Sequence, residues 1–352
     1  MKSKFWGILI LILVVVAAVA YRIIIVDPGP QVDLNGFLGG EKSGLFKNED
    51  FKKIIKKKYN LTMDFHVSGS YKMIQQDSAD KDYLFPSSQL ALELFQKEGN
   101  KASDDEIVLN TPIVLYSRKL VVDALVKEGI VDQVDGVSYV DMAKLSDLMK
   151  EKKTWSDIGL GQLNGRILVA TTDPNESNSG NMFLGLLANA LNGYKVVDQA
   201  ALQNILPTLK EIYQSLGYMQ TSSSDMFNQF LRLGVGAYPI IAGYESQLLE
   251  FSKLQESTFN QVKDDIVILY PKPTVWSSHV YIALNDDAKV GIEALLDEEV
   301  QNLAWKEHGY RTIVAGTGDI KEFQVPGLAK DVTQIMAMPN IDVMLQLMDA
   351  IK

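Results

Sequence analysis

From Val32 onward, short apolar runs alternate with amphipathic segments. The run "VDLNGFLGG" (32–40) predicts a strand that ends in a glycine pair. The segment "NEDFKKIIKKKYN" (48–60) places apolar residues at helical spacing with lysines on the opposite face, and "LTMDFHV" (61–67) predicts the next strand. This alternation predicts an α/β fold with largely parallel sheets.

The same pattern continues to the end of the chain. Further strands are predicted at "DYLFP" (82–86), "EIVLNTPIVLYSR" (106–118), "GRILVATT" (165–172) and "SHVYIAL" (278–284). Further helices are predicted at "SQLALELFQKEG" (88–99), "MFLGLLANALNG" (182–193) and "AKVGIEALLDEEVQNLAWKEHG" (288–309). The tail "DVTQIMAMPNIDVMLQLMDAIK" (331–352) is amphipathic, and Pro339 is expected to break it.

The N-terminus has the features of an export segment. Lys2 and Lys4 precede the apolar run "FWGILILILVVVAAVA", which ends in small residues as cleavage sites do. Apolar residues resume after Arg22, so the stretch is also nearly long enough to span a bilayer, which takes about 20 residues. Residues 1–26 are therefore predicted to be a signal peptide or a retained transmembrane anchor. Residues 27–31 would link it to a body outside the cytoplasm.

Length and composition restrict the class of protein. A chain of 352 residues favours two domains or two lobes. A net charge of −10 argues against a nucleic-acid partner, because a phosphate-binding surface carries excess lysine and arginine. The absence of cysteine excludes disulfides, thiolate metal sites and a cysteine nucleophile.

No catalytic motif is found in the sequence. The three histidines, His66, His279 and His308, lie in unrelated segments without ligand spacing, and we expect them to be structural. An EF-hand loop starting at Asp77 would need glycine at its sixth position and glutamate at its twelfth, where the chain has Asp82 and Ser88. There is no nucleophile elbow, Walker loop or zinc-protease motif. We therefore expect no enzyme activity, no catalytic residues, no metal site and no cofactor.

Small hydroxyl and glycine residues recur where a predicted strand ends and a helix begins. Four loops share this pattern: "GGEKSG" (39–44), "VSGSYK" (67–72), "FPSSQ" (85–89) and "NESNSGN" (175–181). A helix N-terminus offers unpaired N–H groups at the positive end of the helix dipole, which suits an anion or another electron-rich group. In open α/β sheets, ligands also collect at the carboxyl ends of strands.

The alternative is that these residues are only helix caps. Ser, Asn and Asp are the preferred N-caps of any helix, so each loop by itself is better explained as a cap. We interpret "SSSD" (222–225) in that way. There are four such loops in total, and they are spread over both halves of the chain. This makes a shared ligand site as good an explanation as helix capping.

The order of these segments resembles the extracellular solute-binding proteins of ABC importers, in particular the type II group that includes the molybdate- and sulfate-binding receptors. "LGGEKSG" and "YNLTMDFHVSGSYKMI" resemble the serine-bearing loops of lobe one, and "GRILVATTDPNESNSGNMFLGLLAN" resembles the helix start of lobe two. "NTPIVLYSR" is similar to the strand that crosses between the lobes, "GVGAYPIIAGYES" to the segment with a binding-site tyrosine, and "LYPKPTVWSSHVYIAL" to the return strand. The likeness covers about residues 32 to 313.

The resemblance implies a periplasmic-binding-protein-like type II fold, with two α/β lobes joined by a two-strand hinge. Lobe one would comprise residues 32–115 and 266–315, and lobe two residues 116–265. Residues 316–352 would form a C-terminal helical extension without a counterpart in the compact oxyanion receptors. Its methionines either pack on the body or form a partner surface: Met336, Met338, Met344 and Met348.

The resemblance also implies a ligand site in the cleft between the lobes. Its members would be Ser43, Ser68, Ser70 and Ser87 from lobe one and Ser177, Asn178, Ser179 and Tyr244 from lobe two. Glu41 and Glu245 are further candidates. The serines suit an oxyanion, whereas a carboxylate in the cleft would repel an anion and suit a cation or an amine, so the solute stays open.

The function implied is capture of a small solute by hinge closure and delivery to an ABC permease in the membrane. The receptor is expected to be a monomer, exported to the cell surface or periplasm and tethered if the N-terminal helix is retained. The alternative is a membrane-anchored sensor or interaction protein that uses the same fold without transport.

Overall fold

The computed structural model describes residues 30–312 and 319–352. The predicted signal peptide or anchor at 1–26 lies outside these residues, as does most of the predicted linker at 27–31. Within the described ranges, no helix has both the length and the apolar character needed to cross a bilayer.

The strands of the described residues join into one connected sheet of ten strands. They are β1 (Val32–Leu38), β2 (Leu61–Val67), β3 (Tyr83–Phe85), β4 (Asp104–Arg118), β5 (Val131–Val134), β6 (Val137–Val140), β7 (Ile240–Tyr244), β8 (Ile266–Pro271), β9 (Trp276–Ala283) and β10 (Arg311–Thr312). Their order is β2-β1-β3-β9-β4-β8-β6-β5, and β7 and β10 also pair with β4.

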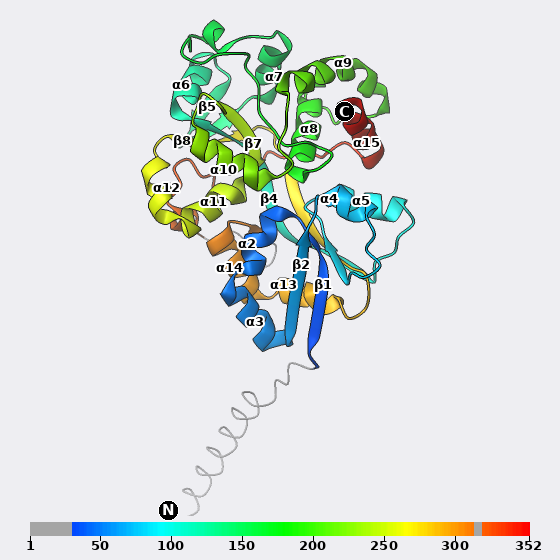
Figure 1. The fold of residues 1–352 in the computed structure, drawn as a ribbon. Helices are drawn as coiled ribbons and strands as arrows, with labels where there is room; N and C mark the ends of the chain where they lie inside the picture. Colours follow the sequence, from blue (N-terminus) through cyan, green and yellow to red (C-terminus); the bar gives the residue numbers. More distant parts are fainter. Residues whose placement is uncertain (1–29, 313–318) are drawn as a thin grey trace, which may run out of the picture.

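The long strand β4 belongs to both lobes. Its first part pairs with β9 and β10, whereas its last part, from Ile113 to Arg118, pairs with β7 and β8. Strands β1, β2 and β3 extend the first half-sheet, and β5 and β6 extend the second. In Figure 1 these half-sheets form the lower body, lobe one, and the upper body, lobe two. The predicted two-lobed α/β fold is confirmed.

The prediction of largely parallel sheets is wrong. β1 is parallel to β2 and β3, and β6 is parallel to β8, but every pair made by β4 is antiparallel. The reason is that β4 runs from lobe one to lobe two while β8 and β9 return in the opposite direction beside it. A strand–helix alternation along the sequence does not reveal such a return.

Helices surround both half-sheets. The longer ones are α3 (Glu49–Tyr59), α5 (Gln89–Lys97), α6 (Lys119–Lys127), α7 (Met142–Lys150), α8 (Asn178–Leu191), α9 (Gln199–Leu216), α10 (Ser223–Leu233), α11 (Glu245–Leu254), α14 (Glu298–His308) and α15 (Ile341–Ala350). Shorter ones are η1 (Gly40–Lys42), α2 (Ser43–Lys47), α4 (Ser70–Gln75), η2 (Trp155–Ile158), α12 (Glu256–Val262), α13 (Lys289–Leu295) and η3 (Ile320–Phe323).

Most predicted elements are present, and one strand is not. Residues 165–172 form no named strand and make only isolated bridges. Ala170 exchanges backbone hydrogen bonds with Ile240 and Ala242 of β7 at 2.9 Å each, and Arg166 bridges to Thr154. The segment is apolar because it packs in the core, where Ile167 and Val169 are buried. Burial of this kind and a sheet ladder give the same sequence pattern.

Strand β8 pairs with the second half-sheet. Residues 266–271, which the sequence-based division assigns to lobe one, lie between the end of β4 and β6. We propose that the boundary between the lobes falls instead at residues 272–275, between β8 and β9.

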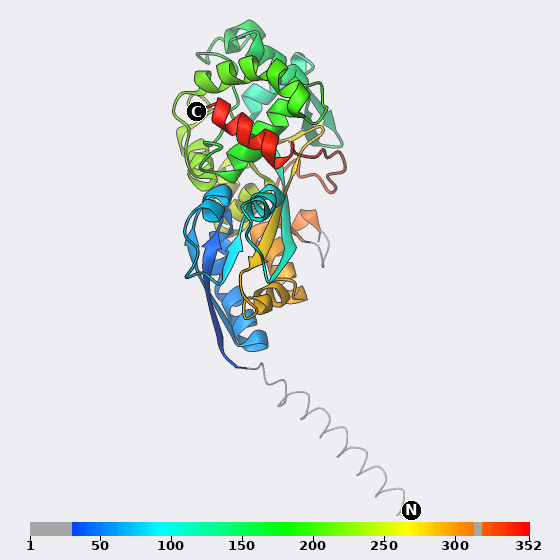
Figure 2. The same cartoon turned by 90° about the vertical axis from the view of Figure 1, so that its right-hand side faces the viewer.

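The C-terminal extension crosses from lobe one back to lobe two. Backbone hydrogen bonds join Thr274 to residues 334 and 336 at 3.0 and 2.8 Å, next to the hinge. Helix α15 then packs against α8 and α9, as Figure 2 shows in red. Met344 and Met348 are buried there, so these methionines pack on the body. The helix begins only after Pro339, and residues 331–338, which belong to the same predicted amphipathic segment, form no helix.

The largest apolar core is shared between the lobes. One cluster of buried side chains contains residues of α4 and α5 from lobe one, α8 and α9 from lobe two, and α15. A second cluster lies within lobe one, and a third joins lobe two to η3 and the residues that follow it. The C-terminal helix is therefore part of the packing that connects the two lobes.

Candidate functional site

A small pocket lies where the serine-bearing loops meet. It has a volume of about 60 Å³ and is lined by residues 39–41 and 67–70 of lobe one and 176–178 and 221–223 of lobe two. Three of the four predicted loops line it. The fourth lining segment, 221–223, contains the first two serines of "SSSD" (222–225), a stretch that the sequence interpretation treats only as a cap.

Two helices of lobe two begin at this pocket. Ser177 is the N-cap of α8, but its side chain makes no capping hydrogen bond, and its Oγ lies 3.2 Å from Ser179 Oγ. Ser222 caps α10 by accepting a hydrogen bond from the N–H of Asp225 at 3.3 Å. The first N–H groups of α8 therefore have no partner from the Ser177 side chain and face a site that suits negative charge.

The two lobes approach each other closely at the pocket. A Cβ atom added to Gly69 would lie 2.2 Å from the carbonyl oxygen of Glu176, so only glycine fits at this contact. At the rim, Lys72 Nζ lies 3.1 Å from Glu176 Oε2. Asn178 Nδ2 donates to the carbonyl oxygen of Ser87 at 2.8 Å across the same boundary. These contacts define a closed arrangement of the lobes.

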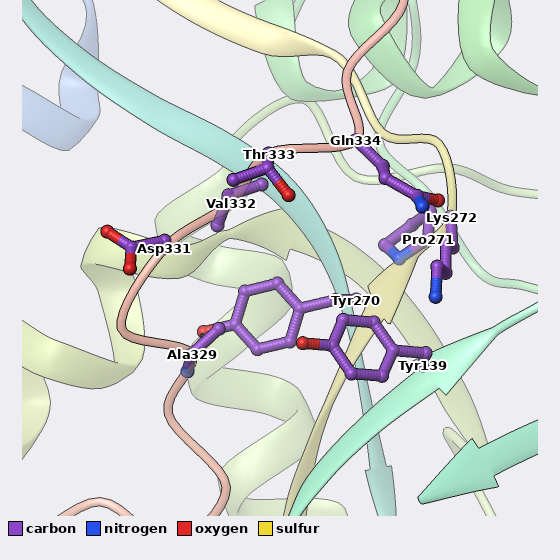
Figure 3. A pocket seen from close by; sticks show the side chains of 9 residues that line it. All are labelled: Tyr139, Tyr270, Pro271, Lys272, Ala329, Asp331, Val332, Thr333 and Gln334. Carbon is purple, nitrogen blue, oxygen red and sulfur yellow. Dashed lines mark hydrogen bonds between the residues drawn. The ribbon is translucent and has the colours of Figure 1, made fainter. Parts of the chain in front are cut away.

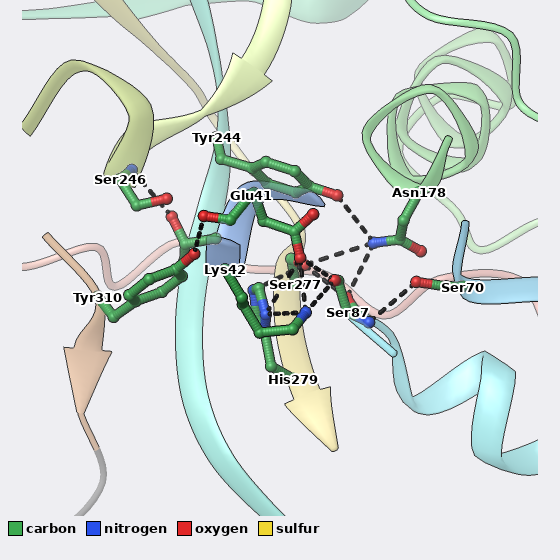
Figure 4. A network of polar contacts seen from close by, with 11 residues as sticks. Glu41, Lys42, Ser70, Ser87, Asn178, Tyr244, Ser246, Ser277, His279 and Tyr310 are labelled. Atoms are coloured by element: carbon green, nitrogen blue, oxygen red, sulfur yellow. Dashed lines mark hydrogen bonds and ion pairs between the residues drawn. The ribbon is translucent and has the colours of Figure 1, made fainter. Parts of the chain in front are cut away.

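A buried ion pair lies beside the pocket (Figure 4). Lys42 is completely buried, and its Nζ is 2.6 Å from Glu41 Oε1, 2.6 Å from Ser87 Oγ and 3.0 Å from His279 Nδ1. The Ser87 hydroxyl also donates to Glu41 Oε1. The charge of Glu41 is therefore balanced from within lobe one.

A second set of hydrogen bonds fixes Asn178 in place. Its Nδ2 donates to Ser87 O and, at 3.0 Å, to the hydroxyl of Tyr244. Ser277 Oγ donates to the same Ser87 carbonyl at 2.5 Å, and Tyr310 donates to the Glu41 carbonyl oxygen at 2.8 Å. Strands β7, β9 and the segment before β10 thus hold this network from both lobes.

Two polar atoms of the pocket lining are buried without a partner. Among the described residues, nothing hydrogen-bonds to Ser68 Oγ or Asn178 Oδ1. Leaving a buried polar atom unpaired costs about 1–3 kcal/mol, and nearly all such atoms in proteins are satisfied. We therefore treat these two atoms as candidates for contact with a bound polar group.

Burial and charge together set the ionisation of this cluster. Burial alone would raise the pKa of Glu41, but the charge of Lys42 and hydrogen bonds from Lys42 and Ser87 lower it to about 2. Burial lowers the pKa of Lys42, which the charge of Glu41 opposes. Burial, helped by the charge of Lys42, holds the pKa of His279 well below 6.5. At neutral pH Glu41 is ionised and His279 is neutral.

Acid is expected to destabilise the protein in two steps. Below pH 6.5 the unfolded chain protonates His279 while the folded chain does not, so stability falls as the pH falls. Glu41 adds a second loss as the pH falls from 4.5 towards 2. Urea unfolding between about pH 8 and about pH 2 measures both. His279→Gln should flatten the upper range, and an unchanged slope in that variant would contradict this assignment.

The structure brings most of the predicted site residues together. Glu41, Ser68, Ser70, Ser177 and Asn178 line the pocket. Ser87 and Tyr244 belong to the hydrogen-bond network beside it. Three candidates belong neither to the lining nor to that network: Ser43, which lies in α2, Ser179, whose Oγ is 2.9 Å from Thr172 Oγ1, and Glu245, which pairs with Arg311.

Sequence reasoning missed four contributors. These are Lys42, Ser277 and His279 in the buried network and the loop 221–223 at the pocket. The position of Lys42 in a loop of glycines and serine is only a weak sequence signal for a role at the site. A lone histidine in an apolar strand gives no such signal for His279. Within the described residues, no group of three or more His, Asp or Glu side chains could hold a metal ion.

A second pocket lies beside the C-terminal extension and has a different character. It measures about 90 Å³ and is lined by Tyr139, Tyr270, Ala329 and residues 331–334, among others (Figure 3). The hydroxyl of Tyr270 is already engaged, since it donates to Glu245 Oε1 at 2.5 Å and accepts from the N–H of Ala329 at 3.1 Å. We therefore assign these contacts to the docking of the extension.

Comparisons with known proteins bear on the fold. No protein-family model and no curated protein matches the chain. Among solved structures, a substrate-binding protein of an ABC transporter from Agrobacterium tumefaciens is 12% identical with a TM-score of 0.55, over 93% of this chain and 96% of that one. The periplasmic binding protein AfuA from Actinobacillus pleuropneumoniae, with fructose-6-phosphate bound, is 13% identical with a TM-score of 0.58. The match covers 90% of this chain and 96% of that one.

A third similar structure is described as a two-component system protein that mediates signal transduction. It is 13% identical with a TM-score of 0.53, over 91% of this chain and 100% of that one. At such identities the likeness concerns the fold. The chain has the type II fold of the periplasmic solute-binding proteins of ABC transporters.

Proposed function

We propose that the protein is an extracellular receptor that captures a small solute with anionic oxygens and delivers it to an ABC permease. The observation that carries this proposal is the small pocket of about 60 Å³ between the lobes, whose lining residues Asn178 and Ser68 have buried polar atoms, Oδ1 and Oγ, without partners among the described residues. A pocket of that size holds a group of only a few heavy atoms. Sugars and peptides would not fit in this closed form.

The electrostatics of the pocket favour negative charge on the solute. The N-termini of α8 and α10 lie at the pocket, and small hydroxyl side chains add donors. The sequence raised Glu41 as an objection to an anion. That objection is weakened because Lys42 Nζ, 2.6 Å away, balances the carboxylate.

The proposed receptor acts outside the cytoplasm as a monomer. An exported protein fits the fold, whose similar structures include a periplasmic binding protein. Residues 1–26 would then either direct export or tether the receptor near its permease. Closure of the lobes on the solute would present the surface that the permease recognises.

The proposal predicts that a small oxyanion stabilises the protein. A solute present at 100 times its dissociation constant should add about 2.7 kcal/mol to the free energy of unfolding. A thermal-shift screen of the domain from residue 30 onward, with oxyanions, metal ions, amines, sugars and amino acids, measures this. The proposal fails if no oxyanion shifts the melting temperature.

Gly69→Val provides the matched control for that screen. Its side chain would collide with the carbonyl oxygen of Glu176, which lies 2.2 Å from the position of an added Cβ. The lobes could then not reach the closed arrangement, although each could still fold. We expect circular dichroism like that of the wild type and no response to the solute. A full response would show that binding does not need closure.

A second candidate function is a sensor that binds the solute without transport. The likeness to a two-component signalling protein supports it. The C-terminal segment also supports it. Because this segment is hydrogen-bonded to Thr274 beside the hinge, a hinge movement would displace a part of the chain that lies outside the pocket. Uptake of the radiolabelled solute by cells with and without the gene separates the two, because a sensor leaves uptake by other carriers unchanged.

A further inference from the structure

A third pocket lies within lobe two and is separate from the pocket between the lobes. It measures about 220 Å³, and its lining residues all lie between positions 155 and 240, so lobe two alone builds it. It shares no lining residue with the pocket of about 60 Å³. A dry cavity of about 150 Å³ with apolar walls can bind benzene. The larger volume here has room for a single ring with one small substituent.

The third pocket lies where one segment of the chain changes its pairing partner. The N–H of Ile167 donates to the carbonyl oxygen of Lys153 at 2.8 Å, whereas three residues later Ala170 pairs with β7. Leu168, between these two pairings, lines the pocket together with residues 236–240. The gap in the pairing therefore forms a cavity whose walls are fixed by backbone hydrogen bonds on both sides.

Aromatic and sulfur-containing side chains contribute to the wall of the third pocket. Trp155 is buried and Tyr238 is half-buried, and the hydroxyl of Tyr238 is engaged because it donates to Gln229 Oε1 at 2.8 Å. Tyr218 also belongs to the lining and is 82% exposed, so a ligand in the pocket could cover its ring. Aromatic rings and methionine sulfurs both make favourable contacts with a flat ring. The methionines of the lining are Met219 and Met226.

A single positive charge accompanies these walls. Among the described residues that line the third pocket, Arg166 is the only one with a charged side chain. Its Nη1 donates to Ser215 Oγ at 3.1 Å, and no ion pair is made to it within the described part of the chain. A guanidinium has five N–H donors in a planar fork that matches a carboxylate. The pocket therefore suits a ligand with an apolar body and one anionic group.

We infer that lobe two has a second ligand site, which binds a small carboxylate with a flat apolar body, the chemistry of an aromatic acid. Arg166 binds the carboxylate, and the aromatic and methionine side chains of the lining contact the ring. This inference goes beyond the proposed function and does not depend on it, because the site lies in lobe two alone and needs no closure of the lobes.

Benzoate, benzyl alcohol and acetate test the second ligand site at neutral pH by isothermal titration into the full chain. Benzyl alcohol keeps the ring without the charge and should bind about fivefold more weakly than benzoate, as expected for an ion pair that is exposed to water. Acetate keeps the charge without the ring and should bind at least about tenfold more weakly. The inference is wrong if benzoate does not bind, or if either analogue binds as tightly as benzoate.

Two methionines report where benzoate binds. Its ring should shift the ¹³C-methyl resonances of Met219 and Met226, which line the pocket, and leave that of Met73 in lobe one unchanged. Substitution of each methionine by leucine assigns the signals. Gly69→Val, which prevents the close approach of the lobes, should show the same shifts and the same affinity. Unchanged Met219 and Met226 signals, or loss of benzoate binding in Gly69→Val, would place benzoate elsewhere and overturn the inference.

Replacing Arg166 by glutamine tests its role in binding the carboxylate. Arg166→Gln should weaken benzoate binding by about fivefold and leave the affinity for benzyl alcohol unchanged, because only the charged ligand loses a partner. Arg232→Gln is the control, since Arg232 is also exposed in lobe two but does not line the pocket. An unchanged affinity of Arg166→Gln for benzoate would refute this role. The comparison of benzoate with benzyl alcohol on the wild type does not require the variant to fold.

Discussion

Replacing Arg311 by methionine is expected to lower the free energy of unfolding by about 3–5 kcal/mol. Arg311 Nε lies 2.6 Å from Glu245 Oε2 and its Nη2 lies 2.9 Å from Glu245 Oε1, which makes a two-pronged contact. Glu245 is completely buried, and Arg311 is 5% exposed. Among the described residues, the variant would leave the Glu245 carboxylate in the protein interior with only the hydroxyl of Tyr270 as a side-chain partner.

The loss of stability in Arg311→Met should arise because the Glu245 charge is left unpaired. Urea unfolding of Arg311→Met, of Glu245→Gln and of the double variant gives the coupling between the two side chains. The double variant should recover part of the loss, because no charge is then left buried without its partner. Lys119→Ala removes an exposed ion pair and should change stability by at most about 1 kcal/mol. If Arg311→Met lowers the free energy of unfolding by only about 1 kcal/mol or less, Arg311 and Glu245 do not form the stabilising buried pair described here.

This prediction also concerns Glu245 as a candidate ligand residue. Its two carboxylate oxygens already accept hydrogen bonds from Arg311 and Tyr270, and it does not line the pocket of about 60 Å³. We propose that Glu245 holds β10 and the C-terminal extension against lobe two. The neighbouring Tyr244, by contrast, reaches the pocket through Asn178.

Leu347→Ala is expected to lower the free energy of unfolding by about 2–5 kcal/mol. Leu347 is completely buried on α15 and belongs to the apolar cluster that contains side chains from both lobes. The truncation removes apolar contacts and leaves a cavity in that cluster. Urea unfolding monitored by circular dichroism measures the change.

The neighbouring residue provides the control for this variant. Gln346 is exposed, and Gln346→Ala should change stability by about 0.5 kcal/mol or less. Because the cluster spans both lobes, Leu347→Ala should shift the whole unfolding transition. A separate early transition would instead show that α15 stabilises only a part of the molecule.

The sequence is a good guide to the elements with strong local patterns. The helix at 49–59 has its apolar stripe, and Asn48 caps it by accepting from the N–H groups of Asp50 and Phe51. The sheet topology could not be predicted in the same way. The direction in which β8 and β9 pass β4 depends on contacts between residues far apart in the chain, and local periodicity contains no information on them.

The site was predictable only where it depends on local sequence patterns. Serines at helix starts are visible in the sequence, and Ser68, Ser70 and Ser177 do line one pocket. The partner of Glu41 was not predictable. Lys42 follows it directly in the chain, but only the fold shows that its side chain turns into the interior, where Ser87 and His279 contact it.

In the proposed receptor, the course of the C-terminal segment means that residues far from the solute help set the energy needed to open the protein. Helix α15 packs on α8 and α9, and its Asp342 pairs with Lys97 of α5 in lobe one. Separating the lobes would expose part of this apolar packing, at about 2.5 kcal/mol for each 100 Å². A change in the length of this tail would therefore retune how long a solute stays bound, without altering any residue that contacts it.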